Sequence, residues 1–150
     1  MKDRINVGII GFGTVGSGTA RILINNADII KRRLGIPVVL KKMADLDIKK
    51  DRGIKLDKDV LTTDADKILD DPDIDIVIEL IGGYEPAKGF ILKAIERGKC
   101  VVTSNKALLA VHGEEIFHTA ASKGVDIGFE GSVGGGIPII RILKEGLAAN

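Results

Sequence analysis

The sequence predicts an α/β fold with a doubly wound, mostly parallel sheet and helices on both of its faces. Its strand-like runs are short and nearly continuous in Val, Ile and Leu, as in strands that are buried on both sides. Longer segments with the helical spacing of apolar residues separate these runs, and this alternation is typical of parallel α/β domains. Since 150 residues is the size of one domain, we expect residues 1–150 to form a single unit.

Six runs qualify as strands because each is apolar and is bounded by glycine, proline or aspartate turn signals. In chain order they are Ile5–Ile10, Val38–Ala44, Val60–Thr62, Ile74–Leu80, Cys100–Thr103 and Asp126–Glu130.

The helices are predicted from their start and stop signals. A long first helix runs from Thr14 to Gly35, where the glycine and Pro37 stop it. Asp64 is a suitable N-cap for the short segment ADKILDD. Three further helices are predicted at Pro86–Gly98, Gly113–Lys123 and Pro138–Ala149. The last one reaches the end of the sequence, which indicates a piece of a longer protein.

Composition excludes several classes of partner. Lys and Arg number 22 against 21 Asp and Glu, and aromatic residues make up 3%, so that a nucleic-acid partner is not expected. No run approaches the roughly 18 apolar residues of a membrane span. A single cysteine, Cys100, excludes an internal disulfide and suits a reducing compartment. With no signal-peptide pattern at the start, we expect a cytoplasmic protein that does not contact membranes.

The stretch NVGIIGFGTVGSG places a glycine-rich turn between the first strand and the first helix. Gly11 allows the tight turn, Gly13 lets a pyrophosphate approach the backbone, and Gly16 lets the helix pack on the sheet. The free N–H groups of Thr14 and Val15 then face the phosphates at the positive end of the helix dipole. This pattern, in this context, predicts dinucleotide binding.

An acidic residue that closes the second strand of such a fold binds the adenosine ribose. Asp45 stands there, 29 residues after Gly16, later than the usual ~20 because the first helix is long. Its charge would repel a 2′-phosphate and so favours NAD. Lys49, Lys50 and Arg52 follow closely and could hold that phosphate, so both NAD and NADP stay open.

The other chemistry-bearing residues follow later strands. Glu79 nears the carboxyl end of the fourth strand, and Ile81, Gly82 and Gly83 form a turn there that is a candidate for the nicotinamide side. The stretch VVTSNKALLA delivers Lys106 after the next strand, at the same edge of the sheet. We therefore expect its ammonium group to point into the cofactor cleft.

The stretch FEGSVGGGIP combines the Glu130 carboxylate with three consecutive glycines. These glycines free the backbone to turn its carbonyls inward. One carboxylate and several carbonyls form a hard-oxygen set, which suits Na⁺, K⁺ or Ca²⁺ and not zinc.

Together, GFGTVGSG, IELIGG, VVTSNKALLA and the segment FEGSVGGGIPII…ILKEGLAAN closely resemble the N-terminal half of homoserine dehydrogenases, over essentially the whole chain. The resemblance implies NAD(P)-dependent interconversion of L-homoserine and L-aspartate 4-semialdehyde in threonine, methionine and isoleucine biosynthesis. It implies homoserine or the semialdehyde as the small-molecule substrate and a homodimer for the full-length enzyme. It also implies a following substrate and catalytic domain that this chain does not contain, so the chain alone is expected to be inactive.

The resemblance further assigns roles to individual residues. It places the phosphate loop on Phe12, Thr14 and Val15, and the active-site lysine on Lys106, with Ser104 also contacting the cofactor. A monovalent cation, Na⁺ or K⁺, would be held by the Glu130 carboxylate and three carbonyls, those of Val133, Gly135 and Ile137. Many members of the family carry an arginine at or beside the acid that closes the second strand. Here its neighbours are Ala44 and Leu46, which puts a preference for NADP in doubt.

Two other interpretations stay open. One is a different semialdehyde or imine reductase of the same fold. An aspartate-semialdehyde dehydrogenase would need a nucleophilic cysteine in the cleft, and Cys100 begins its strand at the wrong end. The other is a stand-alone redox-sensing module that binds NAD(H) without catalysis. Such a module would have no reason to keep Lys106 and the glycine loop after Glu130.

Overall fold

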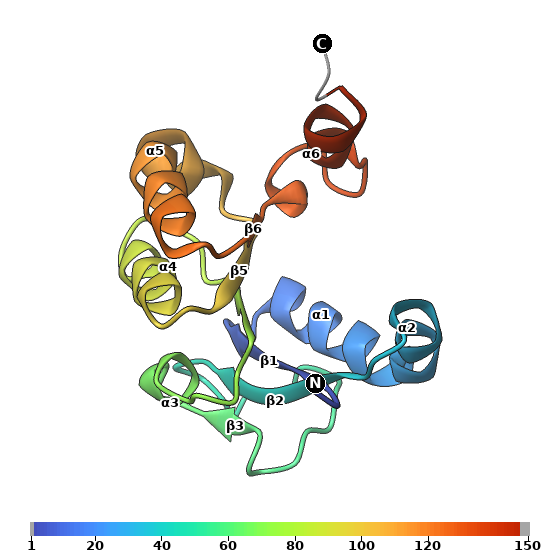
Figure 1. Cartoon of the computed structure of the whole chain (residues 1–150). Coiled ribbons are helices and arrows are strands. Elements are labelled where there is room, and N and C mark those ends of the chain that lie inside the picture. Colours follow the sequence, from blue (N-terminus) through green and yellow to red (C-terminus); the bar gives the residue numbers. More distant parts are fainter. Residues whose placement is uncertain (1, 148–150) are drawn as a thin grey trace.

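The computed structural model describes residues 2–147 and contains one sheet of six strands, in the order β3-β2-β1-β4-β5-β6 (Figure 1). Every neighbouring pair is parallel, which confirms the predicted doubly wound α/β fold. Three strands have the predicted bounds: β1 Ile5–Ile10, β2 Val38–Ala44 and β5 Cys100–Thr103. Three are shorter than predicted: β3 Leu61–Thr62, β4 Ile76–Glu79 and β6 Ile127–Gly128.

The order of the strands reverses at β1. The chain moves from β1 to β2 and β3 on one side, and then returns to place β4, β5 and β6 on the other. In the sheet register, Ile10 pairs with Ala44 on one side and with Glu79 on the other. Ligands of open α/β sheets bind at such a reversal, beyond the carboxyl ends of the strands.

The predicted first helix is two helices, α1 Thr14–Asn25 and α2 Ala27–Leu34. The chain leaves helical geometry at Asn26, with φ −107° and ψ 15°. Asn and Asp form helices poorly because their side chains compete for backbone hydrogen bonds, and Asn25, Asn26 and Asp28 cluster at this point. The predicted stop is confirmed, because Gly35 ends α2 in the left-handed region at φ +76°.

Two short helices follow their predicted signals. Before α3 (Asp66–Leu69), Asp64 Oδ1 accepts a hydrogen bond from the N–H of Asp66 at 2.9 Å, although Ala65 is the residue that flanks the helix. Helix α4 spans Ala87–Glu96 and begins directly after Pro86.

Helix α5 is longer than predicted. It spans Lys106–Lys123 and not Gly113–Lys123, and it ends at Gly124 in the left-handed region. Its N-cap is Asn105, whose side chain accepts a hydrogen bond from the N–H of Leu108 at 3.2 Å. Lys106 is therefore the first residue of a helix.

The predicted helix Pro138–Ala149 is only partly present. The structure has a 3-10 turn η1 at Glu130–Ser132, then α6 Ile139–Arg141 and a π-helical turn η2 at Ile142–Gly146. The predicted residues Ala148 and Ala149 lie outside the described residues. Glycine destabilises helix interiors, and Gly146 stands where the regular helix was expected to continue. Within residues 2–147 no helix is long and apolar enough to cross a bilayer.

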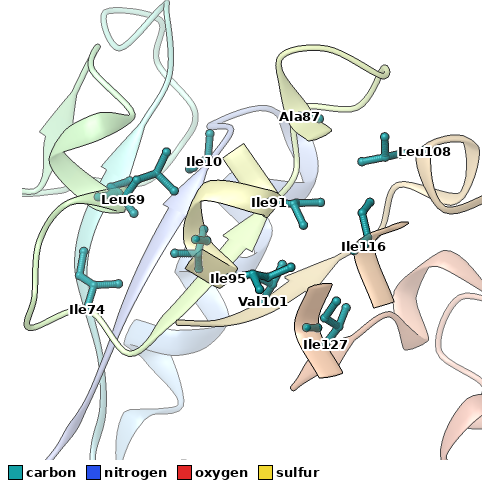
Figure 2. Packing of buried hydrophobic residues seen from close by; sticks show 14 of the residues in the cluster. Ile10, Leu69, Ile74, Ala87, Ile91, Ile95, Val101, Leu108, Ile116 and Ile127 are labelled. Atoms are coloured by element: carbon teal, nitrogen blue, oxygen red, sulfur yellow. The ribbon is translucent and has the colours of Figure 1, made fainter. Parts of the chain in front are cut away.

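The apolar core lies on both faces of the sheet. On one face, Ile91 and Ile95 of α4 and Ile116 of α5 pack with Val77 and Val101 of the sheet (Figure 2). The second face holds a cluster under α1 that contains Val7, Ile9, Phe12, Ala20 and Met43. Figure 1 shows α1 and α2 on the opposite side of the sheet from α4 and α5. A cleft lined by Ile10, Ala44 and Leu80 lies at the carboxyl ends of β1, β2 and β4.

Candidate functional site

The turn between β1 and α1 is fixed by two glycines. Gly11 has φ +112°, and a Cβ there would lie 2.8 Å from the carbonyl carbon and oxygen of Leu80. A Cβ on Gly16 would lie 1.9 Å from the carbonyl oxygen of Gly11. Both positions exclude larger residues because the obstacle is backbone, which cannot move aside as a side chain can.

Gly13 is a glycine for a different reason. Among the described residues, no atom lies within 4 Å of the position that its Cβ would occupy. No side chain caps the first turn of α1 within residues 2–147, and Gly13 is the N-cap residue. The N–H groups of this first turn, which include those of Thr14 and Val15, therefore face an open space at the positive end of the helix. An anionic group fits such a place.

Asp45 ties the end of β2 to the glycine turn. Its Oδ2 accepts a hydrogen bond from the N–H of Phe12 at 2.6 Å, and its Oδ1 accepts one from the N–H of Asp47 at 2.9 Å. The sequence did not reveal this tether. The Phe12 side chain is buried in the core, so that only its backbone takes part in the site.

A cleft of ≈ 450 Å³ opens at the reversal of strand order. Of the predicted site residues, the structure brings five together in its lining: Gly11, Gly13, Asp45, Ile81 and Gly82. Gly83, Ser104 and Lys106 are not among the described residues that line it. Ile81 and Gly82, which the sequence assigns to the nicotinamide side, thus line the same cleft as Asp45, which the sequence assigns to the adenosine ribose.

The three basic residues after β2, Lys49, Lys50 and Arg52, do not lie together at the site. Arg52 borders a second hollow of ≈ 340 Å³ together with Thr14 and Arg21. Its guanidinium carbon lies 5.9 Å from the centre of the Phe12 ring, and its Nε is buried with no hydrogen-bond partner among the described residues. Lys49 and Lys50 are exposed. Of these three basic residues after β2, Arg52 is therefore the one that borders the same hollow as Thr14, at the start of α1.

The turn after β4 is organised by a buried carboxyl group. Glu79 has no exposed surface, and its Oε1 accepts hydrogen bonds from the N–H groups of Ile81 at 2.9 Å and Gly82 at 3.1 Å. Its Oε2 accepts a hydrogen bond from the Thr103 hydroxyl at 2.7 Å. The sequence placed Glu79 at this strand end but did not show that it shapes the cleft wall.

Lys106 is exposed at the first position of α5. A cation is unfavourable at the positive end of a helix dipole, so the stability of the helix does not explain why a lysine stands there. Its N–H donates to the carbonyl of Ser104 at 3.0 Å, and Ser104 is half-buried. The neighbouring Asn105 donates from Nδ2 to the carbonyl of Gly83 at 2.6 Å, which links this segment to the turn after β4.

The segment after β6 uses Glu130 as a helix cap. Its Oε1 accepts from the N–H of Ile140 at 2.9 Å and its Oε2 accepts from the N–H of Arg141 at 3.1 Å. The Ile137 carbonyl accepts a hydrogen bond from the N–H of Ile139, and Val133 and Ile137 have exposed side chains. In the described part of the chain, no three His, Cys, Asp or Glu side chains form a cluster that could hold a metal ion. A cation here would depend on the backbone carbonyls of Val133, Gly135 and Ile137 beside one carboxylate.

These features together define a class of protein. A parallel sheet in the order 3-2-1-4-5-6, a glycine turn at its reversal and an acidic residue closing β2 are those of a Rossmann-type nucleotide-binding domain. A family model described as "Homoserine dehydrogenase, NAD binding domain" matches residues 11–130. The chain belongs to this family.

Known relatives agree with this assignment. The homoserine dehydrogenase of Bacillus subtilis is 47% identical over 146 residues, which is 97% of this chain and 34% of the relative. A crystal structure of a homoserine dehydrogenase from Thiobacillus denitrificans superposes with a TM-score of 0.90 at 48% identity, covering 98% of this chain and 34% of that one. A hyperthermophilic archaeal homoserine dehydrogenase in complex with NADPH has a TM-score of 0.76 at 26% identity, covering 93% of this chain and 48% of that one. The chain thus spans about a third of the length of its curated relatives.

Proposed function

We propose that this chain is the dinucleotide-binding part of an enzyme that interconverts L-homoserine and L-aspartate 4-semialdehyde with NAD(P) as cofactor. Its family and its 47%-identical relative support this activity. Because the chain spans about a third of such relatives, the groups that hold the substrate would belong to further sequence. We expect the complete enzyme to be a homodimer, and residues 1–150 alone to bind cofactor without turning over homoserine.

The observation that carries this proposal is the open space in front of Gly13. A Cβ there would enter a space that no described atom fills, at the uncapped start of α1. A pyrophosphate fits this place because backbone N–H groups and the helix dipole both favour an anion. Thr14, Val15 and the backbone of Phe12 would surround it, with Gly11 and Gly16 holding the turn.

The choice between NAD and NADP depends on Asp45 and Arg52. Asp45 lines the cleft, and its carboxylate oxygens keep lone pairs for a ribose hydroxyl beside the backbone bonds that they already accept. Arg52 has a buried Nε without a partner among the described residues, and one archaeal relative is known with NADPH. We propose that NAD binds at least as well as NADP. Tighter binding of NADP would show that Arg52 serves a 2′-phosphate.

Lys106 is the proposed catalytic group. The cofactor supplies hydride transfer between its nicotinamide and the substrate carbon. Negative charge then builds on the carbonyl oxygen, and a positioned ammonium group stabilises it or gives it a proton. Lys106 follows a rigid strand and is exposed, which leaves its Nζ free to approach a substrate. Ser104, and the turn of Ile81, Gly82 and Gly83, would contact the cofactor nearby.

We also propose a monovalent-cation site, for Na⁺ or K⁺, at Glu130 with the carbonyls of Val133, Gly135 and Ile137. The positive φ of Gly134 and Gly135, +70° and +62°, supports a turn that can direct carbonyls to one side. Glu130 is already occupied as the cap of α6. In residues 1–150 alone we therefore expect weak cation binding or none, which calorimetry with NaCl and KCl would measure.

A stand-alone redox-sensing module is the second candidate function. It would bind NAD(H) through the same turn, but the comparisons do not favour it, because the relatives are dehydrogenases. A cysteine-dependent semialdehyde dehydrogenase is also disfavoured, since Cys100 begins β5, at the edge of the sheet opposite the cleft.

Calorimetry of NADH and NADPH binding tests the proposal. Gly13→Val should abolish binding and leave the fold intact, because its Cβ meets no described atom within 4 Å and the side chain enters the space that a pyrophosphate needs. Gly89→Val is the matched control, since Gly89 lies on α4 and its Cβ would make only an ordinary contact, 3.6 Å from Glu85 Oε2. If Gly13→Val binds as well as the unmodified chain does, this site does not hold the dinucleotide.

A further inference from the structure

Two buried polar residues end neighbouring strands. Glu79 and Thr103 are partners in the β4–β5 register, and they are 0% and 1% exposed. Strand side chains alternate between faces, so both lie on the face of Val77 and Val101, under α4 and α5. A buried polar pair requires hydrogen bonds to be tolerated, and each of its groups has them here.

The hydrogen bonds pass through the Thr103 hydroxyl. It donates its single proton to Glu79 Oε2 at 2.7 Å and accepts from the N–H of Asn105 at 3.0 Å. The other oxygen of Glu79 holds the N–H groups of Ile81 and Gly82. One hydroxyl therefore connects the turn that lines the cleft with the residue that caps α5.

We propose that Thr103 is a positioning residue, whose hydroxyl holds the Lys106 end of α5 at a fixed distance from the cleft turn after β4. This inference rests on the proposed dinucleotide function and extends it. The cleft turn contacts one part of the bound cofactor, and the start of α5 presents Lys106 and Ser104 to its nicotinamide part. Without the hydroxyl, the bond from Asn105 Nδ2 to the Gly83 carbonyl remains, but it does not by itself fix the position of the start of α5 relative to the cleft turn.

Two substitutions separate the hydrogen bonds from the shape of the side chain. Thr103→Val keeps the volume but leaves Glu79 Oε2 and the Asn105 N–H without this partner in a buried place. Thr103→Ser keeps the hydroxyl and loses only a methyl group. A role in packing alone would make serine the more harmful change, whereas a role in positioning makes valine the more harmful one.

The experiment compares NADH with ADP-ribose, which lacks the nicotinamide, by calorimetry on this chain, with fluorescence of the reduced nicotinamide alongside. For Thr103→Val we expect the Kd of NADH to rise about tenfold, the size of one lost hydrogen bond, and the Kd of ADP-ribose to change less than about twofold. Thr103→Ser should restore the NADH affinity and its fluorescence.

Equal weakening of both ligands by Thr103→Val, or no weakening of NADH, would overturn the inference and leave the proposed function standing. If the unmodified chain binds neither NADH nor ADP-ribose, the inference about Thr103 and the proposed function are both wrong. If Thr103→Val loses ADP-ribose altogether through misfolding, Thr103→Ala decides, because it differs from Thr103→Ser only by the hydroxyl. Thr103→Ala should show the selective loss of NADH that Thr103→Ser does not show, and equal NADH affinities of the two variants would overturn the inference.

Discussion

Glu79 and Lys99 are buried residues with ionisable side chains, and they lie at opposite edges of the sheet. Glu79 accepts hydrogen bonds beside the cleft, whereas Lys99 donates them at the amino edge. At the carboxyl edge, the Glu79 carboxyl accepts from two backbone N–H groups and one hydroxyl. At the amino edge, Lys99 is 4% exposed, and its Nζ donates to the carbonyls of Asp71 and Ile74. Burial lowers the pKa of Lys99, and the nearby Asp71 and Asp75 carboxylates oppose that shift.

The difference lies in what surrounds each group. Around Lys99, the acidic side chains are matched with lysines, since Lys41 pairs with Asp71 and Lys2 with Asp75. Around Glu79, the neighbouring elements present groups to open space, namely the uncapped first turn of α1 and the exposed Lys106. The amino edge is thus built for stability, whereas the carboxyl edge keeps donors and charge available for a ligand.

Lys106→Ala should have the largest effect, and only on catalysis. In a longer protein that carries the proposed substrate-binding part, we expect kcat to fall on the order of 10²–10⁴-fold, as for other acid–base groups. Cofactor affinity should change much less, because Lys106 does not line the cleft. Steady-state kinetics with parallel dinucleotide titration measures both. Turnover within a few-fold of the unmodified enzyme would remove Lys106 from the mechanism.

Gly16→Ala tests whether the glycine turn is also structural. A Cβ there would lie 1.9 Å from a backbone oxygen, so we expect a loss of about 3 kcal/mol in the free energy of unfolding. Gly18→Ala, on the same helix, meets no described atom within 4 Å and should gain up to about 1 kcal/mol through helix propensity. Urea unfolding of both variants measures the contrast. Equal stabilities would mean that α1 does not need its close approach to the turn.

Lys99→Met should destabilise the amino edge without affecting the cleft. It leaves the Asp71 and Ile74 carbonyls without their buried donor, which costs about 1–3 kcal/mol. Lys42→Met is the matched control, because Lys42 also donates to a carbonyl, that of Asp59, but at an exposed site. Denaturant unfolding and NADH titration separate the two edges. A loss of NADH affinity at constant fold would contradict the division between them.

Periodicity and turn signals predicted the strands well and the helix bounds less well. Strands β1, β2 and β5 have the predicted ends because glycine, proline or polar residues bound their apolar runs closely. The break at Asn26 was missed because apolar residues continue on both sides of it. The prediction began the fifth helix at Gly113, whereas Asn105 caps α5, so that its first two turns were missed.

The site was predictable where its residues are close in sequence or follow a known pattern. Gly11 and Gly13 of the glycine turn and Asp45 lie in the lining of one cleft. The Glu79–Thr103 pair was not predicted, because it joins residues 24 positions apart through the register of two strands. The sequence did contain a sign of this pair, since Glu79 and Thr103 are polar residues at the ends of two buried strands. Only the register shows that they oppose each other.

The smallest expected effect is the loss of stability in acid that the Asp71 carboxyl group causes. Burial opposes ionisation of Asp71, but hydrogen bonds from Lys41 and from the N–H of Asp73 outweigh it, and the pKa of Asp71 lies below its ordinary value of 3.8. A group whose pKa is lower in the folded state contributes stability above its unfolded pKa and loses it as pH falls through the folded one. The contribution of Asp71 is thus complete at neutral pH and is lost progressively as pH falls below about 4 and through the lower pKa of the folded state.

Asp71→Asn should therefore lower stability at pH 7 and flatten its loss in acid, by less than about 1 kcal/mol because Lys41 is partly solvated. Asp73→Asn is the control. The side chain of Asp73 is 73% exposed against 17% for Asp71, so water screens its bond to the same lysine more strongly and its effect should be smaller. Thermal unfolding between pH 7 and pH 3 measures both slopes, and NADH affinity at pH 7 should stay constant in each variant. If Asp73→Asn has the larger effect, burial is not what makes the amino edge stable, and the contrast with the carboxyl edge would rest on Lys99 alone.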